Sequence, residues 1–252
     1  MGKTALVLSG GALFTSYQVG AWRALAGSIK PDMYVGTSAG ALNAWCLAGG
    51  QTPDELIEEW LDERTGLLTG TRNSIPFRGL FDRRALEIRC RQLAERFQPQ
   101  ATIGITMVQV PALRSRIVSG PDIGWRHLLA SCAIPGGFPP VFVDGRFYVD
   151  GGVLNSLPIW GAVAMGATRV IAINSLVGNP LPILRTFARG VKLLSQERQN
   201  TFEGVEILRI GPKRPLGNLQ DATVWRKESI EKWIRLGEQD ALEAIETGTH
   251  VA

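Results

Sequence analysis

The chain has 252 residues, of which 45% are hydrophobic and 20% charged, a composition that excludes a disordered protein and suits one α/β domain. Its formal net charge of +4 comes from 27 basic and 23 acidic residues, and no basic cluster or nucleic-acid-reading motif accompanies it. Nucleic acid is therefore not an expected partner. The longest uninterrupted apolar stretch, residues 157–167, is too short to cross a bilayer, so we predict a soluble globular protein.

The three cysteines, Cys46, Cys90 and Cys132, are widely spaced and lie in apolar or helical surroundings. An odd number without a C-x-x-C pair predicts reduced thiols and a cytoplasmic protein. Near the N-terminus, residues 9–11 (Ser-Gly-Gly) interrupt the apolar run 5–14, which argues against a signal peptide.

Hydrophobic periodicity and turn residues predict an alternation of strands and helices along the whole chain. The expected strands cover residues 4–8, 33–35, 103–110, 114–118, 141–143, 146–149, 169–173 and 205–210. The expected helices cover residues 16–26, 39–48, 85–97, 125–132, 159–165, 183–199 and 227–246, with one more that starts at Thr52-Pro53. This alternation predicts a mostly parallel sheet with both faces covered, in a single domain of residues 1–252.

Residues 65–81 follow neither pattern, because Gly and Pro recur in them. We expect an irregular surface segment there, whose apolar side chains could form a lid-like rim over a site.

Ser38 lies in the run Gly36–Gly40, between an expected strand and an expected helix. G-x-S-x-G at such a junction is typical of a nucleophile elbow, in which small neighbours allow the strained turn and the hydroxyl stands at the helix N-terminus. An ordinary strand-to-helix turn with Ser38 as the N-cap explains the pattern equally well at this point.

Two further glycine-rich turns follow expected strands. The first, Leu8–Gly11, offers successive backbone N–H groups that suit an oxyanion hole or a tight turn, whereas the glycine spacing of nucleotide-binding loops is missing. The second is Asp150–Gly152, in which the carboxylate of Asp150 can project into a cleft from the end of a strand. Asp144-Gly145 is expected to be only the turn of a hairpin.

The sequence contains two histidines, neither of them well placed as a base for Ser38. His127 falls within an expected helix, and His250 lies two residues from the end of the sequence. The order Ser38, Asp150, His250 matches that of α/β-hydrolases, but little chain precedes Ser38 to supply that fold's first strands. A Ser-Asp-His esterase using His250 remains the weaker alternative.

Taken in order, these motifs resemble those of the patatin-like phospholipase family. The shared motifs are Gly10-Gly11, Gly36–Gly40, the run 130–140 (Ala-Ser-Cys-Ala-Ile-Pro-Gly-Gly-Phe-Pro-Pro) and Asp150–Gly152. The resemblance is densest over residues 4–48 and 128–173. It implies a three-layer α/β/α sandwich and hydrolysis of lipid acyl esters by a Ser-Asp dyad, without a metal or organic cofactor.

Carried over by motif, the resemblance makes Ser38 the nucleophile and Asp150 the base, with backbone N–H groups of Gly10, Gly11 and Ala12 as the oxyanion hole. It also places Phe14, Ala39 and Phe138 at the substrate. The chain departs from the family pattern at Ala12, Phe14 and Thr15, where the family commonly has Gly, Arg or Lys, and Gly. A non-catalytic or weakly active lipid-binding protein with a degenerate loop is therefore a second alternative.

The expected partner is a lipid or another acyl ester. The stretch 181–194 combines apolar residues with Arg185, Arg189 and Lys192, a pattern that suits a membrane interface. A helix that faces the core with a solvated basic edge gives the same pattern, so both interpretations remain open.

Overall fold

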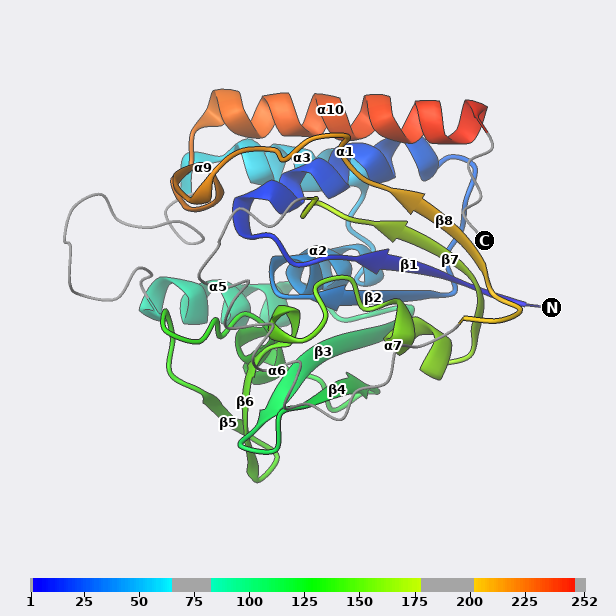
Figure 1. Cartoon of the computed structure of the whole chain (residues 1–252). Coiled ribbons are helices and arrows are strands. Elements are labelled where there is room, and N and C mark those ends of the chain that lie inside the picture. The colour runs from blue at the N-terminus through cyan, green and yellow to red at the C-terminus, as the bar shows by residue number, and fades with distance from the viewer. Residues whose placement is uncertain (1, 65–82, 178–201, 248–252) are drawn as a thin grey trace.

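The computed structural model describes residues 2–64, 83–177 and 202–247, which form one mixed eight-stranded sheet flanked by helices (Figure 1). The parallel part of the sheet has the order β3-β2-β1-β7-β8. These strands are β1 (Lys3–Leu8), β2 (Met33–Thr37), β3 (Thr102–Val110), β7 (Ala167–Ile173) and β8 (Glu206–Ile210). Three antiparallel strands extend it beyond β3, namely β4 (Arg114–Ser119), β5 (Val141–Val143) and β6 (Arg146–Asp150).

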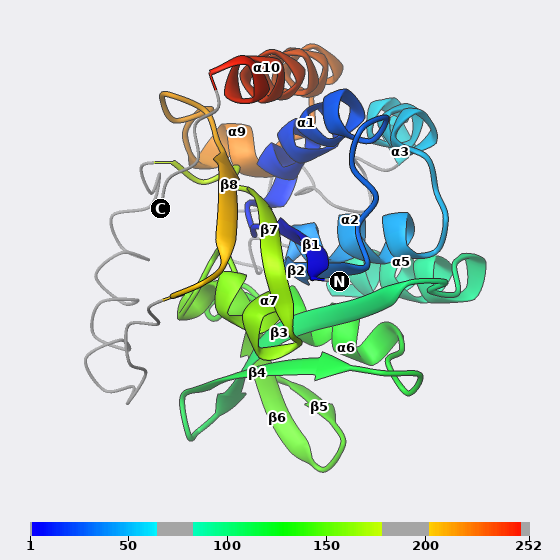
Figure 2. The same cartoon turned by 90° about the vertical axis from the view of Figure 1, so that its right-hand side faces the viewer.

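Alternate residues of the central strands feed two separate cores. In β1, Leu6 and Leu8 belong to the larger cluster, whereas Ala5 and Val7 belong to the smaller one on the opposite face. The helices that contribute to the larger core are α1 (Ser16–Leu25), α2 (Ala39–Ala48), α3 (Pro53–Leu61), α5 (Arg83–Arg96), α6 (Trp125–Ser131), α9 (Leu219–Thr223) and α10 (Lys227–Glu246). The smaller core is covered by α7 (Ile159–Ala164) (Figure 2).

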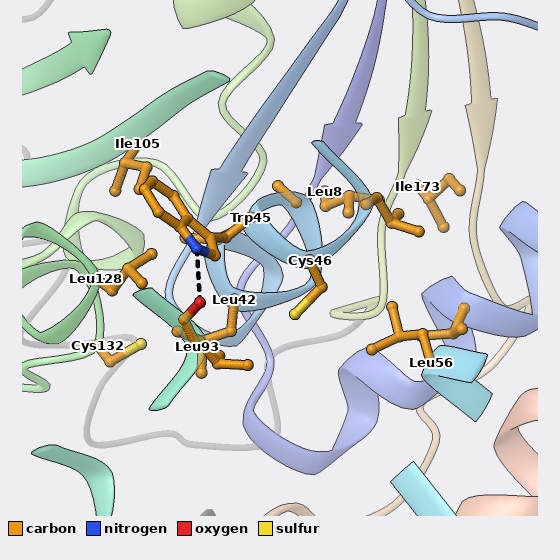
Figure 3. Packing of buried hydrophobic residues seen from close by; sticks show 14 of the residues in the cluster. Leu8, Leu42, Trp45, Cys46, Leu56, Leu93, Ile105, Leu128, Cys132 and Ile173 are labelled. Carbon is orange, nitrogen blue, oxygen red and sulfur yellow. Dashed lines mark hydrogen bonds between the residues drawn. The ribbon is translucent and has the colours of Figure 1, made fainter. Parts of the chain in front are cut away.

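Helix α2 lies at the centre of the larger core and is apolar on nearly every side, as expected of a helix surrounded by other elements. Its Trp45 packs among Leu42, Leu93 and Ile105 (Figure 3). The indole Nε1 of Trp45 donates hydrogen bonds of 3.1 Å to the carbonyl oxygens of Leu93 and Phe97. The second half of α2 is thereby held against α5, which fixes the position of the helix.

The pairing of β3 brings two distant strand ends together. Strand β4 occupies one edge of β3 along residues 104–109, so β2, which pairs with residues 102–106, and β6, which pairs with residues 107–110, must share the other edge. Because β2 runs parallel to β3 and β6 antiparallel, their carboxyl ends meet head to head. Thr37 is opposite Thr106, and Asp150 is opposite the next residue, Met107.

The structure confirms the predicted fold class and, within the described residues, the predicted strands and helices to within a few residues. The predicted helix 183–199 and the irregular segment 65–81 lie outside the described residues. Helix α9 and the 3-10 turns η1 (Ala12–Thr15) and η2 (Gly151–Val153) were not predicted, because they are too short to show a period.

Two further predictions concern the state of the cysteines and the absence of a membrane-spanning segment. All three cysteines are buried and free, as expected for reduced structural thiols. Across residues 2–64, 83–177 and 202–247, no helix combines the length and the apolar character that a membrane span requires.

Candidate active site

Ser38 occupies the sharp turn between β2 and α2 in a strained conformation. Its φ of 54° and ψ of −133° are unfavourable for a residue with a Cβ, a strain that proteins retain mainly at functional sites. Ser38 occupies the N-cap position of α2, but its side chain makes no capping hydrogen bond to the helix. Its hydroxyl lies at the N-terminus of α2, the positive end of the helix dipole. Ser38 as a residue is buried, with 7% of its surface exposed.

The glycine two residues after Ser38 is required by close packing. A Cβ built at Gly40 would lie 2.2 Å from the carbonyl oxygen of Ser9. Ser9 belongs to the turn after β1, residues 9–12, which we call the first loop. That loop also approaches Ser38 itself, since a Cβ at Gly10 would lie 3.2 Å from the Cβ of Ser38. The first loop and the elbow are therefore in direct contact.

Asp150 ends β6 and points its carboxylate at Ser38. The Ser38 side chain interacts with this carboxylate and lowers its pKa, and the N–H of Gly152 donates to Oδ1 over 2.7 Å. Asp150 is 4% exposed, and its own N–H donates to the carbonyl oxygen of Ala133 over 2.9 Å. Burial raises the pKa of Asp150 to about 6, although the interactions with Ser38 and Gly152 act in the opposite direction.

Ser131, at the end of α6, ties the elbow to β3. Its Oγ accepts the N–H of Ser38 over 2.9 Å and donates to the carbonyl oxygen of Thr106 over 2.8 Å. The hydroxyls of Thr37 and Thr106 form a further short hydrogen bond beside it. Sequence reasoning placed Ser131 in a family motif without giving it this role, because the contact depends on the packing of α6 on β3.

The next residue, Cys132, also reaches the site. Its thiol lies near the side chains of Ser38 and Asp150, which both influence its pKa. Burial raises the pKa of the Cys132 thiol well above its usual value, and the neighbouring carboxylate adds to this effect. The Cys132 thiol is therefore harder to ionise than an ordinary cysteine.

The first loop offers fewer free donors than predicted. The N–H of Gly10 donates to the carbonyl oxygen of Ser156 over 2.9 Å, so in this structure it is not free to serve as an oxyanion donor. Within the described part of the chain, no acceptor is bonded to the N–H groups of Gly11 and Ala12. Ala12 has a φ of 49°, the left-handed conformation that favours the glycine common in the family.

A buried polar network supports this loop from below. The Oγ of Ser9 accepts the N–H of Ser175, and the Gln18 amide donates to the carbonyl oxygen of Ser9 over 2.6 Å. Asn43 of α2 donates to Gln18 and accepts from the indole of Trp60, over 3.2 and 3.0 Å. Sequence reasoning missed this network; the polar residues Gln18 and Asn43 within otherwise apolar helices are the signal that could have indicated it.

The three residues predicted to contact the substrate differ in burial: Phe14 is buried, whereas Ala39 and Phe138 are half-buried. Phe14 is 1% exposed and packs edge to face against Trp233, with ring centroids 4.9 Å apart, so it belongs to the core and not to the wall of a site. Ala39 is half-buried at the start of α2, next to Ser38. Phe138 is half-buried and packs against the larger core.

Of the two histidines, only His127 lies within the described residues. Its Nδ1 accepts the N–H of Gly124 over 3.1 Å, and its Nε2 is bonded to the carboxylate of Asp144 over 2.9 Å. Both ring nitrogens are thus engaged in holding α6 to the β5–β6 turn. In the described residues no group of His, Cys, Asp and Glu side chains is arranged to hold a metal ion.

Comparison with known proteins places these features in a family. The patatin-like phospholipase family profile matches residues 6–163, which contain Ser38, Ser131 and Asp150. Patatin-like phospholipase domain-containing protein 7 of Rattus norvegicus is 31% identical over 183 residues, 68% of this chain and 13% of that protein. Triacylglycerol lipase ptl2 of Schizosaccharomyces pombe is 30% identical over 174 residues, 56% of this chain and 26% of the lipase.

The chain thus spans only a small part of these curated relatives. Among solved structures, VipD from Legionella pneumophila has the same fold, with a TM-score of 0.53 and 13% identity over 98% of this chain and 67% of VipD. Since the family profile covers more than half of the sequence, the chain belongs to the patatin-like phospholipase family.

Proposed function

We propose that this protein is a serine acyl hydrolase that cleaves carboxylic ester bonds of lipids or phospholipids, with Ser38 as the nucleophile and Asp150 as the base. The observation that carries the proposal is the buried interaction between the Ser38 side chain and the carboxylate of Asp150, with Ser38 strained at the N-terminus of α2 and the pKa of Asp150 raised to about 6. The names of the two relatives, a phospholipase domain-containing protein and a triacylglycerol lipase, support a lipid substrate.

In the first half of the reaction, Ser38 Oγ attacks the ester carbonyl carbon while its proton passes to the carboxylate of Asp150. A carboxylate whose pKa lies near 6 is a better proton acceptor at neutral pH than one near 4. The carbonyl π electrons move to oxygen, and this oxyanion is stabilised by the N–H groups of Gly11 and Ala12 and by the dipole of α2. We assign these two N–H groups because no described acceptor occupies them.

The tetrahedral intermediate then collapses, the ester C–O bond breaks, and Asp150 gives its proton to the leaving alcohol. Water repeats the sequence on the acyl-enzyme: Asp150 takes a proton from water, the new oxyanion forms at the same donors, and the acid leaves with Ser38 reprotonated. These steps use only side chains, backbone N–H groups and water.

Two alternatives predict different behaviour. In the Ser-Asp-His esterase, His250 is the base; it lies outside the described residues. In a non-catalytic lipid-binding protein, the left-handed Ala12 and the occupied N–H of Gly10 leave the oxyanion hole too weak for turnover.

Covalent labelling by a fluorophosphonate distinguishes the proposed hydrolase from these two alternatives, because the reagent needs a nucleophilic serine and an oxyanion site. We expect mass spectrometry to find the phosphonyl adduct on Ser38 in the wild type and in His250→Ala, and on no serine in Ser38→Ala. Absence of labelling in the folded wild type would support the non-catalytic alternative, whereas labelling abolished by His250→Ala would support the triad.

A further inference from the structure

The β5–β6 hairpin carries exposed aromatic residues where polar ones are expected. On its inner face Val141, Val143 and Tyr148 are buried against the core. On its outer face the cross-strand pair Phe142 and Phe147 is 54% and 51% exposed, with ring centroids 5.0 Å apart. An antiparallel hairpin with one face on the core normally alternates apolar and polar residues, so the two phenylalanines keep a large apolar surface in water.

The apolar surface continues from the hairpin onto the neighbouring strand. Phe147 is opposite Val110 of β3, and cross-strand partners share a face of the sheet. Val110 is partly buried and packs, with Leu113 and Val153, on the small cluster around Val108. We call Val110, Phe142 and Phe147 the hairpin patch.

Three arginines with exposed side chains lie on the opposite face of the same strands. Arg116 and Arg146 both donate to the single amide oxygen of Gln109, over 3.2 and 3.1 Å, and Arg114 is directly opposite Gln109. Among the described residues no carboxylate forms an ion pair with any of the three. Two guanidinium groups that share one neutral acceptor repel each other, and an external anion such as a phosphate relieves this repulsion.

The hairpin lies close to the candidate active site. Strand β3 continues four residues past its pairing with β2, and β6 pairs with this extension and ends at Asp150. Phe147 precedes Asp150 by three residues, or about 10 Å along an extended strand. The hairpin projects from the sheet on the side of the molecule opposite α10 (Figures 1 and 2).

We propose that the β5–β6 hairpin docks this chain on an anionic lipid surface, with the hairpin patch at the acyl boundary and Arg114, Arg116 and Arg146 on lipid phosphates. The hairpin approaches with its turn first, so that side chains of both faces reach the interface, the arginines through their long stems. The carboxylate at the turn, Asp144, is already bonded to His127. This proposal depends on the proposed function in one respect: a lipid hydrolase must reach its substrate in a membrane or a lipid droplet.

Vesicle flotation with purified protein tests the surface independently of catalysis. The probes are vesicles of phosphatidylcholine, with and without phosphatidylserine, and Ser38→Ala is used throughout so that no lipid is consumed. We expect Phe142→Ala with Phe147→Ala to weaken binding about a hundredfold, since each ring loses burial worth about a tenfold change. The charge variant Arg114→Gln with Arg116→Gln and Arg146→Gln should remove the preference for phosphatidylserine, about a hundredfold.

A matched control comes from α10, where Leu242 and Ile245 are exposed to a similar extent, 47% and 48%. Replacing both with Ala should leave vesicle binding unchanged. With Ser38 restored, the phenylalanine variant should hydrolyse a water-soluble p-nitrophenyl ester at the wild-type rate and vesicle phospholipid more slowly. Loss of both activities in that variant would mean damage to the site and would overturn the proposal.

Binding equal to wild type in the phenylalanine variant would also overturn it. A second result would overturn it as well: the wild type does not bind vesicles but forms a dimer, and Phe142→Ala with Phe147→Ala dissociates that dimer. The hairpin patch would then be a contact between two copies of the chain. Hairpin-dependent binding by a protein in which Ser38→Ala has no effect on ester hydrolysis would sustain the docking surface and reject the proposed function.

Discussion

Asp150 is the residue at which stability and chemistry conflict. Its carboxylate is buried and its pKa is raised from 3.8 to about 6, so the folded state binds its proton more tightly than the unfolded chain does. Its contribution to the free energy of unfolding is therefore complete below about pH 4, is lost as the pH rises to about 6, and stays lost above that. The two-unit shift corresponds to about 3 kcal/mol.

Replacing Asp150 with Asn should remove this pH dependence, because the amide cannot ionise and can still accept the hydrogen bond from Gly152. We expect Asp150→Asn to exceed the wild type in unfolding free energy by up to about 3 kcal/mol at pH 8, with the difference vanishing near pH 4. Urea unfolding at a series of pH values measures it. A difference that does not vary between pH 4 and pH 8 would contradict the assigned pKa shift.

Ser131 contacts Ser38 through the backbone N–H of Ser38, so we expect it to position this residue. In Ser131→Ala the Ser38 N–H and the Thr106 carbonyl lose their shared partner, and the elbow can shift. We expect kcat for a soluble ester to fall about ten- to a hundredfold with little change in KM, alongside a loss of about 1–3 kcal/mol in stability.

The control for this prediction is Thr52→Ala, which removes the N-cap of α3 and costs about 1 kcal/mol without touching the site. Its kcat should equal that of the wild type. If Ser131→Ala also kept the wild-type kcat while losing stability, Ser131 would be a structural residue and not a positioning one.

At the scale of elements, the contact between α1 and α10 positions the end of the first loop, because this loop leads into η1 and α1. Gly237 of α10 packs so closely on α1 that a Cβ there would lie 2.0 Å from the carbonyl oxygen of Tyr17. Phe14, in the turn that precedes α1, packs on Trp233 of the same helix. Helix α10 thus holds the segment that carries Gly11 and Ala12.

Gly237→Ala should force the two helices apart and lower the free energy of unfolding by about 1–3 kcal/mol or more. Thermal unfolding measures the loss, and Gly27→Ala, where a Cβ would meet no neighbour within 4 Å, serves as the control. We expect the active fraction, titrated with a fluorophosphonate, to fall while turnover per labelled site stays within about twofold of wild type. An unchanged melting temperature would show that the helices adjust without cost.

The elements themselves were predictable because their periods and caps are local. The Thr52 capping box and the glycines that end α2 are examples, since each can be identified within a few residues. The chemistry of the site was predictable in part: Ser38 and Asp150 were expected to act together, but only by resemblance. Their meeting depends on β2 and β6 sharing one edge of β3, which is a long-range pairing.

The remaining differences between prediction and structure concern contacts between distant parts of the chain. The N–H of Gly10 is taken by Ser156, and Phe14 turns into the core because Trp233 lies there. Neither partner can be inferred from the residues around the first loop. The network from Ser9 through Gln18 to Asn43 was missed for the same reason.

At the scale of the whole molecule, the buried pair Ser38 and Asp150 and the projecting β5–β6 hairpin lie at the same end of the sheet. The edge of β3 brings Ser38 and Asp150 together, and its extension carries β6 and the hairpin patch. Because the pKa of Asp150 lies near 6 and that of a typical histidine near 6.5, a pH–rate profile alone does not separate the dyad from a triad. Substitutions of the two residues do.

The measurement that tests the central claim most directly is p-nitrophenyl ester hydrolysis by wild type, Ser38→Ala, Asp150→Asn and His250→Ala, each first shown to be folded. The account predicts that Ser38→Ala and Asp150→Asn each lower kcat by about a thousandfold or more, whereas His250→Ala stays within about twofold of wild type. Near-wild-type turnover by Asp150→Asn, together with loss of activity in His250→Ala, would contradict it.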